Sequence, residues 1–196
     1  MTEREKQLEK YIVEYALNTA ADDRKKFERI MTENSSGMLK EILRVFNGMF
    51  QKAADGDFPK EVSFLIISYL NSGILNGQIE LKIDLLDKTN LFDENPITEY
   101  CTLHYFDEAM KEDFENFEKF IETKMIRVRY QELYRYKRAC MIKYMSLVED
   151  CMTEFAMLIP HLKSFQTMKK TADFKIVYGE LTSKGSVLYE GNGEMP

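Results

Sequence analysis

The feature that most constrains the fold is a run from residue 107 to residue 159 without a single glycine or proline. Both residue types interrupt helices, so their absence over this length favours helical structure. Apolar residues in the run recur at intervals of three and four, the spacing of one helix face. Residues 107 to 159 are therefore expected to form one long helix or a helix pair.

The two halves of this run differ in charge and in the direction of their apolar face. Acidic residues dominate positions 107 to 122, whereas lysine and arginine dominate positions 124 to 143. At about 100° per residue, the two apolar stripes lie roughly 160° apart on a straight helix, so the buried side must change near residues 125 to 130. No glycine, proline or asparagine marks a break there, which favours a continuous or mildly kinked helix over a break and a return.

Helical spacing also marks the first 50 residues. It predicts a helix over residues 8 to 30, with Asp23 intruding on the apolar face and Asp22 or Asp23 as a candidate cap for a second helix. Residues 35 to 37, Ser-Ser-Gly, predict a stop before a further amphipathic helix at residues 38 to 50.

Residues 62 to 70 are apolar nearly all round and, with Pro59 in the first turn, are expected to form the central buried helix. They open an uncharged stretch that extends to residue 79, but serines, asparagines and glycines interrupt it. A membrane-spanning helix needs about 20 mainly apolar residues. No membrane span is therefore expected.

Alternating apolar and polar residues predict two β regions. Residues 78 to 86 read as a half-buried strand, and residues 173 to 190 read as a hairpin. Because one strand cannot satisfy its own backbone groups, residues 78 to 86 are expected to pair with the hairpin in a small antiparallel sheet. The predicted fold is α+β and mainly helical, with one globular domain at residues 1 to 190 and a loose tail at residues 191 to 196.

Composition and charge exclude several classes of protein. The chain of 196 residues has a net charge of −6, so no general affinity for nucleic acid is expected. The charged first ten residues lack the apolar core of a signal peptide, which favours a cytoplasmic location. Cys101, Cys140 and Cys151 are an odd set without a CxxC spacing, so we expect reduced thiols and no disulfide.

Common catalytic motifs are absent from the sequence. It has no phosphate-binding loop, no dinucleotide-binding glycine motif, no nucleophile elbow and no HExxH zinc motif, and it has only two histidines. These absences favour a protein without enzymatic activity and without a cofactor.

The metal-like cluster with the best spacing is Cys101, His104, Glu108 and Glu112, which share one face if the segment is helical. An acidic helix start with one incidental histidine explains the same residues more simply. Because the ligands are few and poorly spaced for a closed tetrahedral site, no structural zinc is expected.

Lys137 lies near the middle of the apolar stripe that runs from Tyr130 to Phe155. An unpaired buried ammonium is costly, so this lysine must reach the solvent, pair with a carboxylate or line a ligand site. In the last case we expect an anionic ligand in a pocket that also contains Tyr130, Tyr134 and Tyr144.

Basic and aromatic residues are interleaved in the same region. Single-stranded nucleic acids bind such surfaces because bases stack on rings while cations follow the phosphates. The candidate contacts are Arg127, Arg129, Arg135 and Arg138. A solvated helix face, with intramolecular pairing to the acidic run of residues 107 to 122, is the simpler interpretation.

The sequence therefore favours a non-enzymatic intracellular interaction or regulatory protein, whose partner is another protein or a second copy bound through an apolar helix face. One alternative is a small-molecule sensor or cryptic enzyme with a pocket near Lys137. The other is a nucleic-acid-binding module that uses residues 124 to 143.

Overall fold

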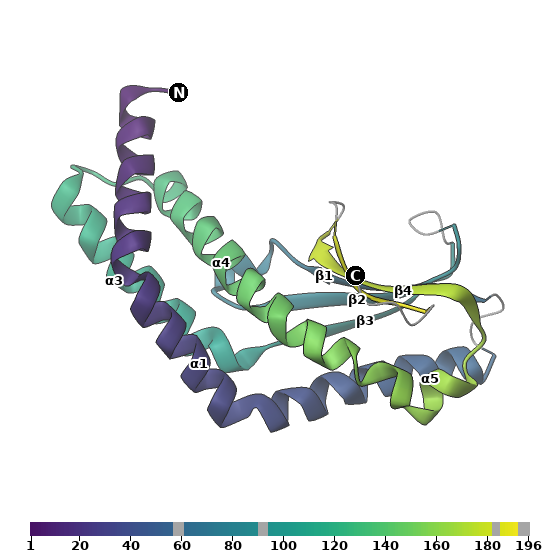
Figure 1. Ribbon diagram of the computed structural model, residues 1–196. Coiled ribbons are helices and arrows are strands. Elements are labelled where there is room, and N and C mark those ends of the chain that lie inside the picture. Colours follow the sequence, from purple (N-terminus) through teal and green to yellow (C-terminus); the bar gives the residue numbers. More distant parts are fainter. Residues whose placement is uncertain (57–60, 90–93, 182–184, 192–196) are drawn as a thin grey trace.

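The computed structural model describes residues 1–56, 61–89, 94–181 and 185–191 and shows long helices packed on a five-stranded sheet (Figure 1). Most of the regular structure is helical, which confirms the predicted α+β class with a predominance of helix. No helix in these ranges is long and apolar enough to cross a membrane. The expected helix start at Pro59 and the expected tail after Gly191 lie outside the described residues.

The elements follow one another in a simple order: α1 (Glu3–Ala54), β1 (Val62–Tyr69), α2 (Gly73–Asn76), β2 (Glu80–Leu86), β3 (Ile97–Thr102), α3 (Asp107–Lys124), α4 (Tyr130–Ala156), α5 (Lys163–Thr167), β4 (Lys170–Glu180) and β5 (Ser186–Glu190). Single 3₁₀ turns precede α3 and follow α4.

The sheet has the strand order β3-β2-β1-β4-β5, with β1 antiparallel to β2 and parallel to β4. The strand at residues 78 to 86 and the C-terminal hairpin are both present as β2 and β4-β5, so these predictions are confirmed. Their direct pairing was a wrong prediction, because β1 lies between them. The sheet is mixed rather than antiparallel and has two more strands than expected.

Residues 62 to 69 form a strand and not the predicted central helix. Leu65 and Ile67 are buried on one face of the sheet, while Phe64 and Ile66 are half-buried on the other. A central strand can consist of a continuous apolar run, and such a run has no periodicity that separates it from a buried helix. Its eight residues and its valine, isoleucines and aromatics fit a strand better.

Helix α1 is continuous from residue 3 to residue 54, so both predicted interruptions were wrong. It begins with a capping box, in which the Thr2 hydroxyl accepts from the Glu5 amide and the Glu5 carboxylate accepts from the Thr2 amide. Asp23 is no cap but a buried residue within the helix. Figure 1 shows that α1 bends in its middle part, the region of the Ser-Ser-Gly sequence at residues 35 to 37.

The long run of residues 107 to 159 breaks into α3 and α4 at residues 125 to 129. The predicted position of the change in buried side is confirmed, whereas the favoured continuous helix was wrong. Met125 leaves the helix with an extended backbone, and Arg127 has a φ of 53°, in the left-handed region. The two helices then turn back along each other (Figure 1).

Arg4, near the start of α1, contacts this turn directly although it is distant from it in the sequence. Its guanidinium donates to the carbonyl oxygens of Ile126 at 3.2 Å and Arg127 at 3.0 Å, and to the carboxylate of Glu132 at 2.6 and 2.9 Å. The hydrogen bond from Arg4 lowers the pKa of Glu132 to about 2. Glu132 in turn accepts from the Arg129 amide and so caps α4.

Figure 1 shows the start of α1, the end of α3 and the start of α4 extending beyond the sheet as a three-helix arm. We call residues 3–24, 115–124 and 130–142 the helical arm. Its core is aromatic: Tyr136 stacks on Phe117 with ring centroids 3.6 Å apart, and Tyr15 meets Phe117 edge-on at 5.4 Å. Aromatic pairs of this kind fix the relative positions of the three helices.

Two glycines, one in α2 and one in the second half of α1, give a test of the backbone geometry. A Cβ atom added at Gly73 would lie 2.1 Å from the Gln78 carbonyl oxygen, whereas one added at Gly48 of α1 would meet nothing within 4 Å. Gly73→Ala is expected to destabilise the protein by about 1 to 3 kcal/mol through overpacking. Gly48→Ala is expected to stabilise it by about 0.5 to 1 kcal/mol because alanine favours helix. Urea melts of both variants measure the effects, and losses of equal size would contradict the α2 geometry.

Candidate functional site

A groove runs along the helical arm between α1 and α4. It has a volume of about 360 Å³ and is lined mainly by apolar or small residues, with charges at its edges: Leu8, Glu9, Ile12, Val13, Arg135, Arg138, Ala139 and Ile142. Several large apolar side chains along it are open to solvent. Val13 is 52% exposed, Ile142 is 48% exposed and Leu17, one turn beyond Val13, is 74% exposed. Isolated exposed apolar residues are common, but a contiguous set marks an interaction site.

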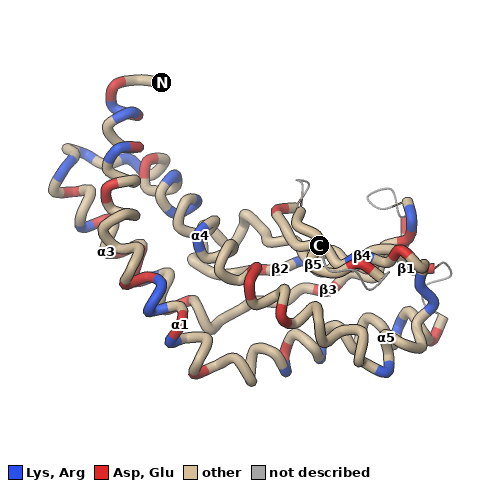
Figure 2. The backbone as a smooth tube through the Cα atoms, in the orientation of Figure 1, with Lys and Arg blue, Asp and Glu red and all other residues tan. Residues whose placement is uncertain are grey.

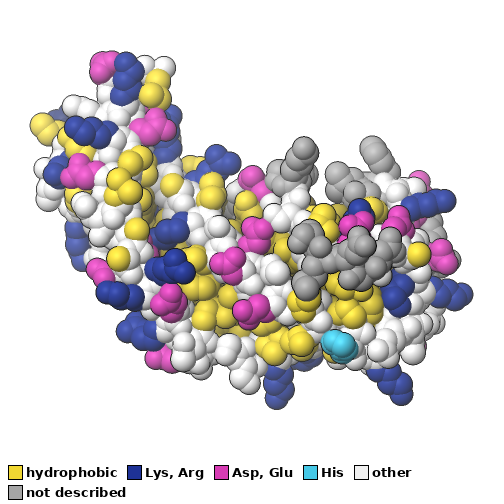
Figure 3. Space-filling model, viewed as in Figure 1, with side chains coloured by type: hydrophobic (Ala, Val, Ile, Leu, Met, Phe, Trp, Pro, Cys, Tyr) yellow, Lys and Arg dark blue, Asp and Glu magenta, His cyan; other side chains and the backbone are white. Residues whose placement is uncertain are grey.

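The groove has charges of both signs around it. Glu9 lies on the α1 side, and Arg135 and Arg138 lie on the α4 side. Figure 2 shows positive and negative residues interspersed along the whole arm, and Figure 3 shows hydrophobic side chains at its surface between them. The groove can therefore accept a partner that also carries both charge signs.

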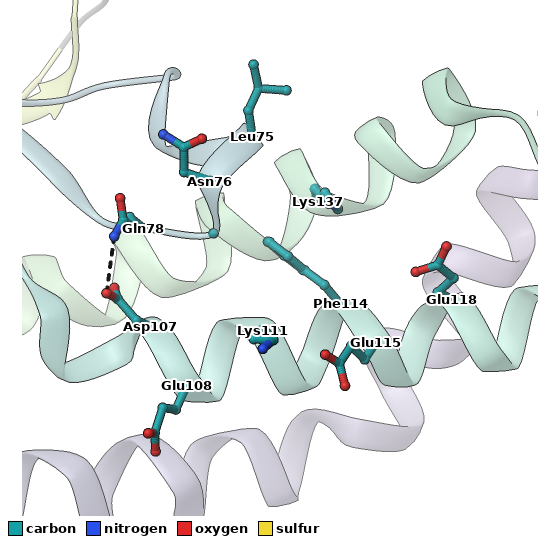
Figure 4. A pocket seen from close by; sticks show the side chains of 11 residues that line it. Leu75, Asn76, Gln78, Asp107, Glu108, Lys111, Phe114, Glu115, Glu118 and Lys137 are labelled. Atoms are coloured by element: carbon teal, nitrogen blue, oxygen red, sulfur yellow. Dashed lines mark hydrogen bonds between the residues drawn. The ribbon is translucent and has the colours of Figure 1, made fainter.

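A second hollow, of about 390 Å³, lies where the α2 turn meets α3 and α4. The Phe114 side chain rises from α3 between Leu75 and Asn76 of the α2 turn and Lys137 of α4 (Figure 4). Lys137 is half-buried, and its Nζ atom lies 5.1 Å from the centroid of the Phe114 ring. Lys137 therefore lines an open hollow at the surface.

This pocket carries more acidic than basic side chains. Lys111 and Lys137 line it together with Asp107, Glu108, Glu115 and Glu118. Within the described ranges neither lysine forms an ion pair, and neither do the three glutamates. Asp107 is engaged, since its Oδ2 atom lies 3.0 Å from His104 Nδ1 and 3.4 Å from Gln78 Nε2.

The three tyrosines predicted beside Lys137 do not line this pocket. Tyr130, the first residue of α4, is 63% exposed, Tyr134 is half-buried and Tyr144 is 1% exposed in the interior. Tyr136, which is 5% exposed, is a buried tyrosine of the arm. Tyr130 is the first residue of α4, next to the turn at residues 125 to 129, and its side chain lies in solvent there.

The interior contains a charged network that joins α1, α3 and α4. Asp113, which is 4% exposed, accepts from Tyr144 Oη at 2.7 Å and from Lys26 Nζ at 3.0 Å. Asp23, which is 7% exposed, accepts from Lys143 Nζ at 2.6 Å, and Lys143 also lies 3.7 Å from Asp113. Two carboxylates thus balance two ammonium groups. Sequence reasoning missed this network as a unit.

Burial holds Tyr144 and the three cysteine thiols in their neutral forms. Burial, reinforced by the charge of Asp113, raises the pKa of Tyr144 far above its usual range. Burial also raises the pKa of Cys140 to about 12 and those of Cys101 and Cys151 to about 11. All three thiols are free and buried, so they are protonated at neutral pH and poorly suited to nucleophilic attack.

The basic residues proposed to bind nucleic acid are partly engaged within the molecule. Arg135 pairs with Glu5 at 2.9 Å, and Arg138 lies 3.7 Å from Glu180. These acids belong to α1 and β4, not to the acidic run of residues 107 to 122 that was expected to neutralise them. Arg127 and Arg129 lie exposed at the turn before α4.

The metal-ligand candidates are not brought together. Cys101 is buried in β3, His104 lies in the 3₁₀ turn and Glu108 and Glu112 belong to α3. Glu112 pairs with Lys26 at 2.8 Å, and His104 contacts Asp107. The assumption of one helix through these residues was wrong. Over the described ranges no three histidine, cysteine or acidic side chains are placed to hold a metal ion.

Comparison of the chain with protein-family models, with curated proteins and with solved structures finds no match. Its function must therefore be inferred from its own residues.

Proposed function

We propose that this chain is a non-enzymatic intracellular interaction or regulatory protein that forms a homodimer through the groove of its helical arm. The observation that supports this most is the row of exposed apolar side chains at Val13, Leu17 and Ile142 along two adjacent helices. Burial of such side chains is favourable at about 25 cal/mol per Å² of apolar surface. A partner helix pair laid along the groove would provide that burial.

A second copy suits this surface because the groove is complementary to itself. In a two-fold contact each residue of the patch meets the same patch on the partner, so a single-sign patch would repel its copy. Here Glu9 lies across the groove from Arg138, and the two-fold operation can place each beside the other on the partner. Ala139, in the groove itself, allows close approach of the helices.

The size of the exposed face is also sufficient. A strip about 25 Å long and 20 Å wide, two helices across, covers about 500 Å² per copy, or about 1,000 Å² in total. Specific interfaces begin at about this size, and small ones give weak, transient complexes. A reversible dimer with a concentration-dependent population is therefore expected.

Val13→Glu and Ile142→Glu should each abolish the dimer, because each places a charge in the apolar contact without disturbing a buried residue. Ile126→Glu is the matched control, since Ile126 is 84% exposed at the α3-α4 turn and does not line the groove. Light scattering after size-exclusion chromatography, over a range of concentrations, gives the mass of each protein. A monomeric wild type, or a dimer unaffected by both groove substitutions, would contradict the proposal.

A small-molecule sensor is the second candidate function, because Lys137 lies at a pocket of suitable volume. A nucleic-acid-binding role has less support, since the chain has a net charge of −6 and acidic residues are interspersed with the basic ones along the arm (Figure 2).

A further inference from the structure

We infer that the pocket beside Lys137 binds a small zwitterion, namely an α-amino acid with an apolar side chain. This inference concerns a different surface from the arm groove and does not depend on dimer formation. It starts from the distribution of charge in the pocket, which differs from that of an anion site.

Lys137 is the basic group placed to bind a carboxylate. It is half-buried, and its position over the Phe114 ring fixes the direction of its ammonium group. Within the described residues it has no carboxylate partner. A ligand carboxylate would supply the partner that the protein itself does not provide.

The acidic groups of α3 provide the complementary half of the site. Glu115 and Glu118 are exposed, unpaired within the described ranges and separated by about one helical turn. Figure 4 shows Glu118 pointing from α3 toward the α4 side of the pocket, whereas Glu108 points away. A ligand ammonium near Glu118 would be attracted, while phosphates or other polyanions would be repelled by the excess of carboxylates.

An apolar surface completes the site. The Phe114 ring stands between the α2 turn and Lys137, whereas the Leu75 side chain, which is 54% exposed, points away from it (Figure 4). Gly77 permits this arrangement, since a Cβ atom there would lie 3.3 Å from the Phe114 ring. An aliphatic, thioether or aromatic side chain would lie against Phe114, while the two ends of the amino acid meet opposite charges.

Calorimetric titration of the full chain with L-leucine, L-methionine and L-phenylalanine tests this inference. At least one should bind with a Kd of about 1 mM or tighter, within reach of a ligand of this size. The N-acetyl derivative lacks the ammonium charge and the amide lacks the carboxylate charge, so each should bind at least tenfold more weakly. Absence of binding by all three amino acids, or equal binding of either derivative, would overturn the inference.

Two substitutions test which side chains bind the carboxylate and the ammonium group of the amino acid. Lys137→Met keeps the side-chain stem and should weaken amino-acid binding at least tenfold, and exposed Glu118→Gln should do the same. Lys119→Met is the control, because Lys119 follows Glu118 on α3 but does not line the pocket. This variant should bind the amino acid like the wild type. Circular dichroism checks that each variant is folded, and Glu118→Gln decides the result if Lys137→Met is not. Unchanged affinity in the folded variants would overturn the assignment.

Discussion

Asp113→Ala is expected to cost about 3 to 5 kcal/mol of unfolding free energy, the usual effect of removing one partner from a buried ion pair. The substitution leaves Lys26 without its buried partner and Tyr144 without its acceptor, and it removes the charge that lies 3.7 Å from Lys143. Since these side chains come from α1 and α4, the loss should loosen the contact of both helices with α3. Urea denaturation at neutral pH measures the change.

Glu112→Ala is the matched control for this experiment. Glu112 precedes Asp113 in the chain and also binds Lys26, at 2.8 Å, but its side chain is 60% exposed. Exposed pairs contribute about 0 to 1 kcal/mol, so its loss should be small. Equal losses for the two variants would show that burial does not govern the strength of this network.

The local sequence correctly predicted the elements that have one buried and one solvent-exposed face, because such elements show a regular pattern of apolar and polar residues. The amphipathic helix of residues 107 to 124 and the alternating strands β2 and β4 are of this kind. Strand β1 was missed because both of its faces carry apolar residues, which removes the alternation that identifies a strand, although one face is only half-buried.

The break between α3 and α4 depends on a contact that is distant in the sequence. Arg4 donates to the carbonyl groups of Ile126 and Arg127, more than 120 residues away. These hydrogen bonds satisfy carbonyl groups that have no partner within a helix, because the chain is not helical at the turn. No glycine or proline is needed there, so the local sequence carried no signal of the break.

The candidate sites were predicted in part. Lys137 was singled out as a charge within an apolar stripe, and the structure places it at a pocket. Asp23 in α1 and Asp113 in α3 are also charged residues on the apolar face of a helix. Asp113 lies between Met110 and Phe117 on the buried face of α3. What the sequence could not show is that these two acids meet Lys26 and Lys143, since that depends on how three helices cross.

A charge exchange between two variants tests the proposed dimer most directly. Glu9→Arg alone should be monomeric, because it places arginine opposite the partner's Arg138, and Arg138→Glu alone should be monomeric because two glutamates then face each other. An equimolar mixture restores opposite charges at both contacts of a two-fold interface. Light scattering should therefore show monomers for each variant and a dimer for the mixture. Monomers in the mixture, or dimers of either variant alone, would contradict a dimer formed through the arm groove.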